Sequence, residues 1–275
     1  MSVVSTNKYL KEYLRRRKEI TPNEYLQLQK EVLCNPVAVY FEEYTAMELH
    51  KYFLDNGLFY PDAKIFQEIK GLEKKCVWEI LECHYEKLQK DWNGEKAVIF
   101  IYPIERRNER IMKELKGKMG LSFHSVVVLF VTKEIPEKEL KALLTHEYNH
   151  VCRLATINKD FDQLTLLDSM LVEGIAEVAV EELFGKEHLA PWVSLYSKKE
   201  LLPHWSRVKR LLHLKGKEKH DPILYGTSLY NGFPKWFGYS IGYLIVSAYM
   251  KEHKEITMSE LLKKDSFEIL TNSGF

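Results

Sequence analysis

The stretch Leu143–Leu154, LLTHEYNHVCRL, carries the pattern that decides how the surrounding chain folds. Three of its residues, His146, Glu147 and His150, spell H-E-x-x-H. In a helix, residues four positions apart lie on the same face, one turn above the other. Two imidazoles at this spacing can bind one zinc ion. The glutamate between them then lies beside the ion, where it can act as a general base.

The residues around this pattern favour a helix. Pro136 suits a first helical turn, and the acidic Glu137 and Glu139 suit its positive N-terminal end. An apolar stripe follows at helical spacing, formed by Leu140, Leu143, Leu144, Val151 and Leu154. Glu147 falls on this stripe, where a carboxylate without a partner would be costly. A metal ion with its water would provide a partner, and the alternative is a surface helix with two histidines on it.

Composition limits the classes of protein to which the chain can belong. It has 275 residues, of which 45% are hydrophobic and 29% charged, as in an ordinary globular protein. The net charge of +1 argues against a basic nucleic-acid-binding surface. No apolar run has the length of a membrane span, and the N-terminus lacks the pattern of a signal peptide. We therefore expect a cytoplasmic protein with neither a nucleic-acid nor a membrane partner.

The N-terminal third of the chain predicts a region that is almost wholly helical. Thr45 and Glu48, for example, have the spacing of a capping box at a helix start. A longer amphipathic helix is expected over about residues 72–92. The Asn-Gly pair at 93–94 can end it. Residues 1–95 are therefore predicted to be an N-terminal helical region.

Two β-rich apolar runs follow these helices. Residues 97–102 (AVIFIY) and 125–132 (SVVVLFVT) predict strands that are buried on at least one face. A polar helix is expected between them, over about residues 105–118, and residues 120–124 form either a turn or an edge strand. We predict that residues 96–275 form a second region and that the protein is α+β in class and mostly helical. The two regions could also pack as one compact unit.

The C-terminal part predicts helices again. One begins near Thr165, which has capping-box spacing to Asp168, and it ends at Gly185. Residues 215–220 are lysine-rich and predict an exposed loop. A largely apolar helix is expected over about residues 234–251, and a short helix then closes the chain.

A catalytic zinc site requires a third protein ligand, and the best candidate is Glu173. It lies 23 positions after His150 (173 − 150), which leaves room for a loop and a second helix packed on the first. Its neighbours are apolar on all sides of that helix: Leu171, Val172, Ile175, Ala176, Val178, Ala179 and Val180. A buried carboxylate needs a partner, so we favour a ligand role over that of a surface glutamate. Glu177, one turn further on, could orient a ligand imidazole.

With these residues, the sequence resembles the gluzincin metallopeptidases, in which a glutamate on the helix after H-E-x-x-H completes the zinc site. It is more closely similar to the YjaZ-like family of predicted zinc-dependent proteases. Three segments carry the resemblance: HEYNH at residues 146–150, EGIAE at 173–177 and GYSIGY at 238–243. The resemblance covers roughly residues 97–253, and the N-terminal helices contribute little to it.

The resemblance implies a fold and a substrate. It implies a zincin-like domain, in which a small twisted sheet lies over the active-site helix and the glutamate helix lies below it. Peptide substrates would then lie along the edge strand of the sheet, near residues 119–125. One zinc ion per chain and a peptide or protein substrate are the expected cofactor and partner. The oligomeric state is left open.

The resemblance also implies a side chain that stabilises the developing oxyanion. Tyr239 is the first choice because of its place in the GYSIGY segment, and Tyr243, Tyr230 and His220 are alternatives. A buried aromatic residue with its hydroxyl hydrogen-bonded would be the purely structural role for Tyr239. The glycines at 238 and 242 favour close helix packing rather than chemistry.

These inferences predict a zinc-dependent peptidase. Zinc held by His146, His150 and Glu173 would activate a water, and Glu147 would take its proton and pass it to the leaving nitrogen. A zinc-binding scaffold or regulatory protein without turnover is the main alternative. A DNA-binding regulator is disfavoured by the charge balance, and an amide substrate other than a peptide is not excluded by the motif.

Overall fold

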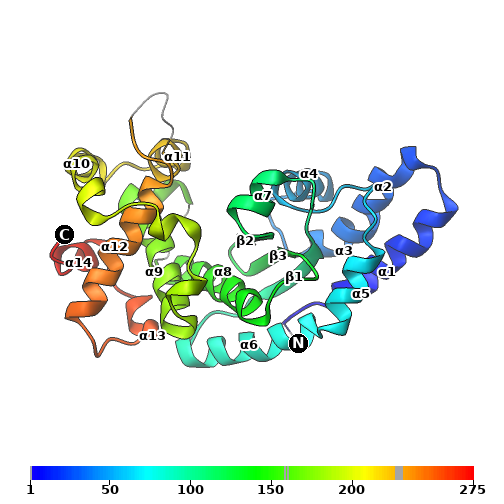
Figure 1. Ribbon diagram of the computed structural model, residues 1–275, viewed down its shortest axis with the longest axis horizontal. Helices are drawn as coiled ribbons and strands as arrows, with labels where there is room; N and C mark the ends of the chain where they lie inside the picture. The colour runs from blue at the N-terminus through cyan, green and yellow to red at the C-terminus, as the bar shows by residue number, and fades with distance from the viewer. Residues whose placement is uncertain (1, 158, 160, 227–231) are drawn as a thin grey trace. The chain divides into compact units, whose positions relative to one another are not determined.

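The computed structural model describes residues 2–157, 159, 161–226 and 232–275 (Figure 1). The chain forms two compact units, one of Met1–Lys90 with Glu95–Val151 and the other of Asp91–Gly94 with Cys152–Phe275. The N-terminal helices and the sheet thus belong to the same unit. The division into domains near residue 95 that the sequence suggested stays a prediction. The mostly helical α+β class is confirmed, and the zincin-like arrangement also stays a prediction.

The N-terminal part is helical, as predicted. Its α-helices are α1 (Thr6–Arg16), α2 (Tyr25–Gln29), α3 (Asn35–Ala38), α4 (Ala46–Asn56), α5 (Phe66–Lys74) and α6 (Val77–Trp92). The capping box at Thr45 and Glu48 is present at the start of α4. The helix predicted over residues 72–92 is confirmed from Val77 to Trp92, and only its start was wrong, because α5 ends at Lys74 and α6 begins at Val77. Cys76 has a φ of 52°, a left-handed conformation that cannot continue a right-handed helix.

Three strands form one mixed sheet in the order β1-β3-β2. The strands are β1 (Val98–Pro103), β2 (Lys118–Ser122) and β3 (Val126–Val131); β1 is parallel to β3, and β2 is antiparallel to it. Both predicted strands are confirmed, and the choice between a turn and an edge strand is settled in favour of the edge strand β2. The helix expected over residues 105–118 is shorter in the structure, where α7 spans Glu109–Glu114. Lys116 and Gly117 have positive φ and lead directly into β2.

The two faces of this sheet are covered by different helices of the first unit. Phe53 of α4 packs on Tyr102 and Phe130, so α4 covers one face. On the other face lies α8 (Glu137–Ile157), as Figure 1 also shows. Its contact with the sheet includes an ion pair between Lys118 of β2 and Glu139 of α8. The H-E-x-x-H helix is therefore fixed against the sheet.

The second unit is built from helices. They are the last turns of α8, then α9 (Leu166–Phe184), α10 (Lys198–Val208), α11 (Lys217–Leu224), α12 (Phe237–Glu252), α13 (Met258–Leu261) and α14 (Ser266–Thr271). The capping box of Thr165 and Asp168 and the end at Gly185 are confirmed. The prediction of an exposed loop over residues 215–220 was wrong, because α11 begins at Lys217 and His220 is buried.

Glycines bring α9 and α12 into backbone contact. A Cβ at Gly242 would overlap the carbonyl of Met170, and one at Gly174 would overlap the carbonyl of Gly242. Gly238 packs in the same way on Leu224 of α11. The prediction that Gly238 and Gly242 serve close packing is confirmed.

A buried arginine joins the end of α8 to the C-terminal helices. Arg153 is 1% exposed and donates to the carbonyls of Leu262 and Lys264, each at 2.7 Å, and to the hydroxyl of Ser266. Ser266 in turn donates to Asp168 of α9. Burial lowers the pKa of Arg153 to about 10, so the guanidinium stays charged at neutral pH and depends on these acceptors.

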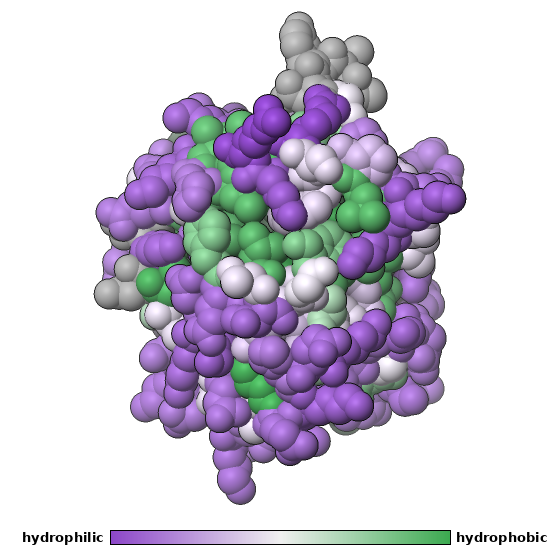
Figure 2. Space-filling model, turned by 90° about the vertical axis from the view of Figure 1, so that its left-hand side faces the viewer, coloured by the Kyte–Doolittle hydropathy of each residue, from purple (hydrophilic) through white to green (hydrophobic). Residues whose placement is uncertain are grey.

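The face drawn in Figure 2 is mainly polar, with apolar residues gathered across its upper middle part. Exposed large side chains of the second unit include Leu183, Leu195, Leu202, Leu211 and Tyr225. Such residues are normal on a globular protein and do not by themselves mark a binding site. Among the described residues, no helix combines the length and the apolar character that crossing a bilayer requires.

Candidate metal centre

The H-E-x-x-H residues lie in the middle of α8. The opposite side of this helix is held by buried residues such as Leu144 and Tyr148, both 0% exposed, and the Tyr148 hydroxyl donates to the carbonyl of Glu95. His146 and His150 share a face, with ring centroids 4.5 Å apart. His150 is 8% exposed. The local spacing therefore places the two imidazoles as the sequence predicted.

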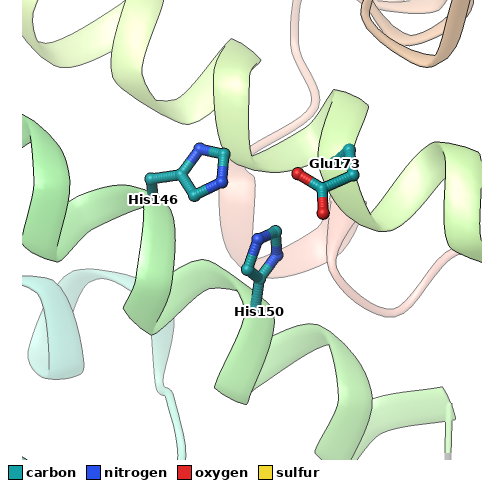
Figure 3. Close-up of side chains that lie close together, drawn as sticks. All are labelled: His146, His150 and Glu173. Carbon is teal, nitrogen blue, oxygen red and sulfur yellow. The ribbon is translucent and has the colours of Figure 1, made fainter. Parts of the chain in front are cut away.

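Glu173 of α9 joins these two histidines. The donor atoms of His146, His150 and Glu173 all lie within 4.8 Å of one another. In Figure 3 the carboxylate and both imidazole rings point toward a common point. Glu173 is only partly exposed, on a helix that is otherwise almost fully buried. Among the described residues, this set is the one cluster of histidine, cysteine and acidic side chains suited to a metal ion.

The chemistry of these donors suits zinc. Two imidazole nitrogens and one carboxylate oxygen are a ligand set of catalytic zinc sites, in which a fourth position is left open. With bonds of about 2 Å, ligands of a tetrahedral zinc lie about 3.3 Å apart. The donor atoms, at most 4.8 Å apart, would therefore close on an ion through small side-chain rotations.

Glu147 points from α8 toward the edge strand. It is 7% exposed, and its Oε2 accepts a hydrogen bond of 2.5 Å from the hydroxyl of Ser122 on β2. Its side chain passes over Gly120, where a Cβ would overlap Cγ, Cδ and Oε1 of Glu147. The sequence motif did not identify Ser122 or Gly120. Their two-residue spacing on an edge strand was the available signal, because alternate residues of a strand share a face.

The predicted partner of a ligand imidazole, Glu177, is buried and lies one turn beyond Glu173 on α9. Its Oε2 accepts a 2.9 Å hydrogen bond from the backbone N–H of Ala190. This contact fixes the chain that follows α9 and gives the buried carboxylate a partner. A role for Glu177 toward a zinc ligand stays a prediction.

Tyr239 of α12 lies in an aromatic cluster of the second unit. Its ring contacts those of Trp192, Trp236 and Tyr225, with centroids 5.0 to 5.5 Å apart. Burial raises the pKa of Tyr239 well above its ordinary value, and the negative charge of Glu173 acts in the same direction. The hydroxyl therefore keeps its proton at neutral pH and remains a hydrogen-bond donor.

The other candidates for an oxyanion-stabilising side chain have different surroundings. The hydroxyl of Tyr243 donates to Oε2 of Glu181 at 2.5 Å. His220 is 1% exposed, and its two ring nitrogens contact the Ser169 hydroxyl and the Leu214 carbonyl. Tyr230 lies outside the described residues. The side chain of Tyr239 is itself hydrogen-bonded to Tyr225, so these contacts do not choose among the candidates, and the role of Tyr239 stays a prediction.

A helix carrying H-E-x-x-H, with a glutamate of another helix beside both histidines, is the arrangement of a candidate zinc hydrolase centre. The chain belongs to the family described as predicted Zn-dependent protease (DUF2268), whose model matches residues 77–271. This match includes every candidate site residue named above.

Two relatives come from Bacillus subtilis (strain 168). The chain is 33% identical over 208 residues to the "Uncharacterized protein YjaZ", a match that covers 75% of this chain and 78% of the relative. It is 28% identical over 142 residues to the "Uncharacterized protein YjfC", covering 49% of this chain and 47% of that protein. No solved structure matches the chain.

Proposed function

We propose that this protein is a zinc-dependent peptidase with one zinc ion held by His146, His150 and Glu173. The observation that carries the proposal is that these three donors, which are distant in sequence, lie within 4.8 Å of one another. The next residue after His146 is a nearly buried glutamate, whose carboxylate is held by a hydroxyl on the edge strand. Membership of a family of predicted Zn-dependent proteases supports the same reaction class.

Bound zinc would supply Lewis-acid chemistry by activating water and polarising the peptide carbonyl. Glu147 would accept the proton of the attacking water and then donate it to the leaving nitrogen. A carboxylate next in sequence to a ligand is suited to this transfer. It can reach both the water oxygen and the leaving nitrogen without movement of the helix. Tyr239, protonated at neutral pH, would donate a hydrogen bond to the developing oxyanion.

The peptide substrate would lie along β2. Within the described part of the chain, β2 pairs with β3 alone, so the backbone groups along its other edge face away from the sheet. An extended peptide could add to this edge as a further strand, with its main chain hydrogen-bonded to β2. Because Glu147 lies directly against Gly120 and Ser122, a peptide bound at this edge would be close to the general base.

The test is metal content together with hydrolysis. Wild type, Glu173→Ala and Glu147→Gln would be purified without added metal, with Glu182→Ala as a control at an exposed position of the same helix. We expect about one zinc per chain in wild type, Glu147→Gln and the control, and loss of zinc in Glu173→Ala. A pool of quenched peptides should be cleaved by wild type and the control, and not by Glu147→Gln. Zinc-loaded wild type that cleaves no peptide would contradict the peptidase and favour a zinc-binding scaffold.

A further inference from the structure

The face of β2 that meets α8 consists of three alternate residues, Lys118, Gly120 and Ser122. The Lys118 ammonium contacts the carboxylate of Glu139 on α8 at 2.5 Å. Gly120 and Ser122 both meet Glu147, two helical turns further along α8. Strand alternation thus aligns one face of the edge strand with this helix.

Ser122 contacts Glu147 at two oxygens. Its hydroxyl lies 2.5 Å from the carboxylate Oε2 and 2.9 Å from the backbone carbonyl oxygen of Glu147. The single hydroxyl proton can be donated to either oxygen. The bond to the carboxylate fixes the direction of the glutamate side chain, whereas the bond to the carbonyl fastens the helix to the strand.

Gly120 provides the space that the glutamate side chain occupies. A Cβ at this position would overlap three atoms of the Glu147 side chain and is not obstructed first by any backbone atom. The φ of Gly120 is not in the positive region, so an alanine there is compatible with the strand. Adding a methyl group would therefore displace the carboxylate of Glu147 rather than break the sheet.

We propose that β2 is the positioning element for the general base: Ser122 holds the Glu147 carboxylate, and Gly120 leaves the space it needs. This inference rests on the proposed function of Glu147. The glutamate side chain has several rotamers, and displacement of a general base by about 1 Å can lower the reaction rate about a hundredfold. The Lys118–Glu139 ion pair also joins strand and helix, two helical turns from the contact of Ser122 with Glu147.

The first test measures kcat, KM and zinc content independently of one another in the zinc-loaded protein. Ser122→Ala should lower kcat for a quenched peptide about tenfold or more, with KM and zinc content close to wild type. Ser122→Thr retains the hydroxyl on a residue that favours strands and should restore most of kcat. Gly120→Ala should lower kcat at least as much as Ser122→Ala. Ser206→Ala, at an exposed position of α10 (Lys198–Val208), is the matched serine control and should remain near wild type.

The second test does not depend on activity. Urea unfolding of the zinc-free protein would be compared for wild type, Ser122→Ala, Glu147→Ala and the double variant. If the hydroxyl holds the carboxylate, the fall in midpoint for the double variant will be smaller than the sum of the two single falls. The bond from Ser122 to the backbone carbonyl remains possible in Glu147→Ala, so the cycle isolates the carboxylate contact.

The outcomes distinguish this inference from the proposed function. Additive midpoints, or a Ser122→Ala enzyme within twofold of wild type in kcat, would overturn the positioning role. A loss of kcat in Ser122→Ala that Ser122→Thr does not restore would also overturn it. Wild type that binds zinc but cleaves no peptide would overturn the proposed function, and coupling in urea would then still support Ser122 as the group that holds the Glu147 carboxylate.

Discussion

Gly174 of α9 lies against Gly242 of α12 so closely that the backbones of the two helices touch. This contact lies one residue from the candidate ligand Glu173 and one turn from Tyr239. A side chain at either glycine would push the helices apart, because the atoms it meets belong to backbone and cannot rotate away. The packing of α9 on α12 therefore helps to fix the part of α9 that carries the candidate ligand Glu173.

Replacing either glycine by alanine should destabilise the second unit. Overpacking of this kind costs roughly 1–3 kcal/mol, and here the obstruction is backbone, so we expect the upper part of that range. Thermal unfolding of Gly174→Ala and Gly242→Ala would measure the effect, with the exposed Glu182→Ala of α9 as the control. A Gly242→Ala protein that unfolds at the wild-type temperature would show that the helices do not pack this closely.

Loss of the buried arginine should be costly. Arg153→Met would leave the carbonyls of Leu262 and Lys264 without this donor and would remove the guanidinium that faces the charge of Asp168. Breaking a buried charged network from one side costs about 3 kcal/mol or more. Urea unfolding would measure the cost, and Lys251→Ala at the exposed end of α12 is the control. Arg153→Lys should recover only part of the loss, because an ammonium cannot reproduce the planar fork.

Acid should destabilise the first unit through two buried histidines. Burial lowers the pKa of His50 and of His84 from 6.5 to about 4. The unfolded chain binds these protons below about pH 6.5 and the folded chain only near pH 4, so stability falls as the pH drops through this range. Each histidine would contribute up to about 3 kcal/mol to the fall, which is complete near pH 4.

Urea unfolding at pH 7 and pH 5 would test this pH dependence. Replacing His50, whose Nε2 contacts the Gln29 side chain at 2.9 Å, by glutamine should reduce the difference in stability between the two pH values. Gln27→Ala, at an exposed position of α2 and without any titratable group, offers a control and should leave that difference unchanged. An equal pH dependence in His50→Gln and wild type would show that His50 does not titrate as described.

Removal of the Tyr239 hydroxyl should lower turnover without removing zinc. In Tyr239→Phe we expect kcat to fall by about a hundredfold, as for the loss of one oxyanion donor, with zinc content unchanged. Tyr243→Phe is the discriminating partner, because its hydroxyl donates to Glu181. If Tyr243→Phe loses turnover and Tyr239→Phe retains it, the assignment of the oxyanion donor must be exchanged.

Local patterns in the sequence determined much of this protein. The spacing of His146, Glu147 and His150 acts within one helix, so a single turn of backbone suffices to place both imidazoles on one face. The apolar residues on every side of α9 identified Glu173, which the structure leaves partly exposed, as a carboxylate in need of a partner. The two apolar strands and the capping box at Thr165 also depend on near neighbours and were predicted correctly.

Only the tertiary structure decided which distant residues meet. Cys76 breaks a helix through a backbone conformation that no local composition signalled, and His220 is buried in a helix despite its lysine-rich surroundings. Ser122 and Gly120 are unremarkable in sequence, and they meet Glu147 because β2 pairs antiparallel with β3 and turns one face toward α8. Strand register and helix packing depend on burial across the whole unit, so the spacing of the candidate ligands could be inferred from the chain alone and the contacts that hold the Glu147 carboxylate could not.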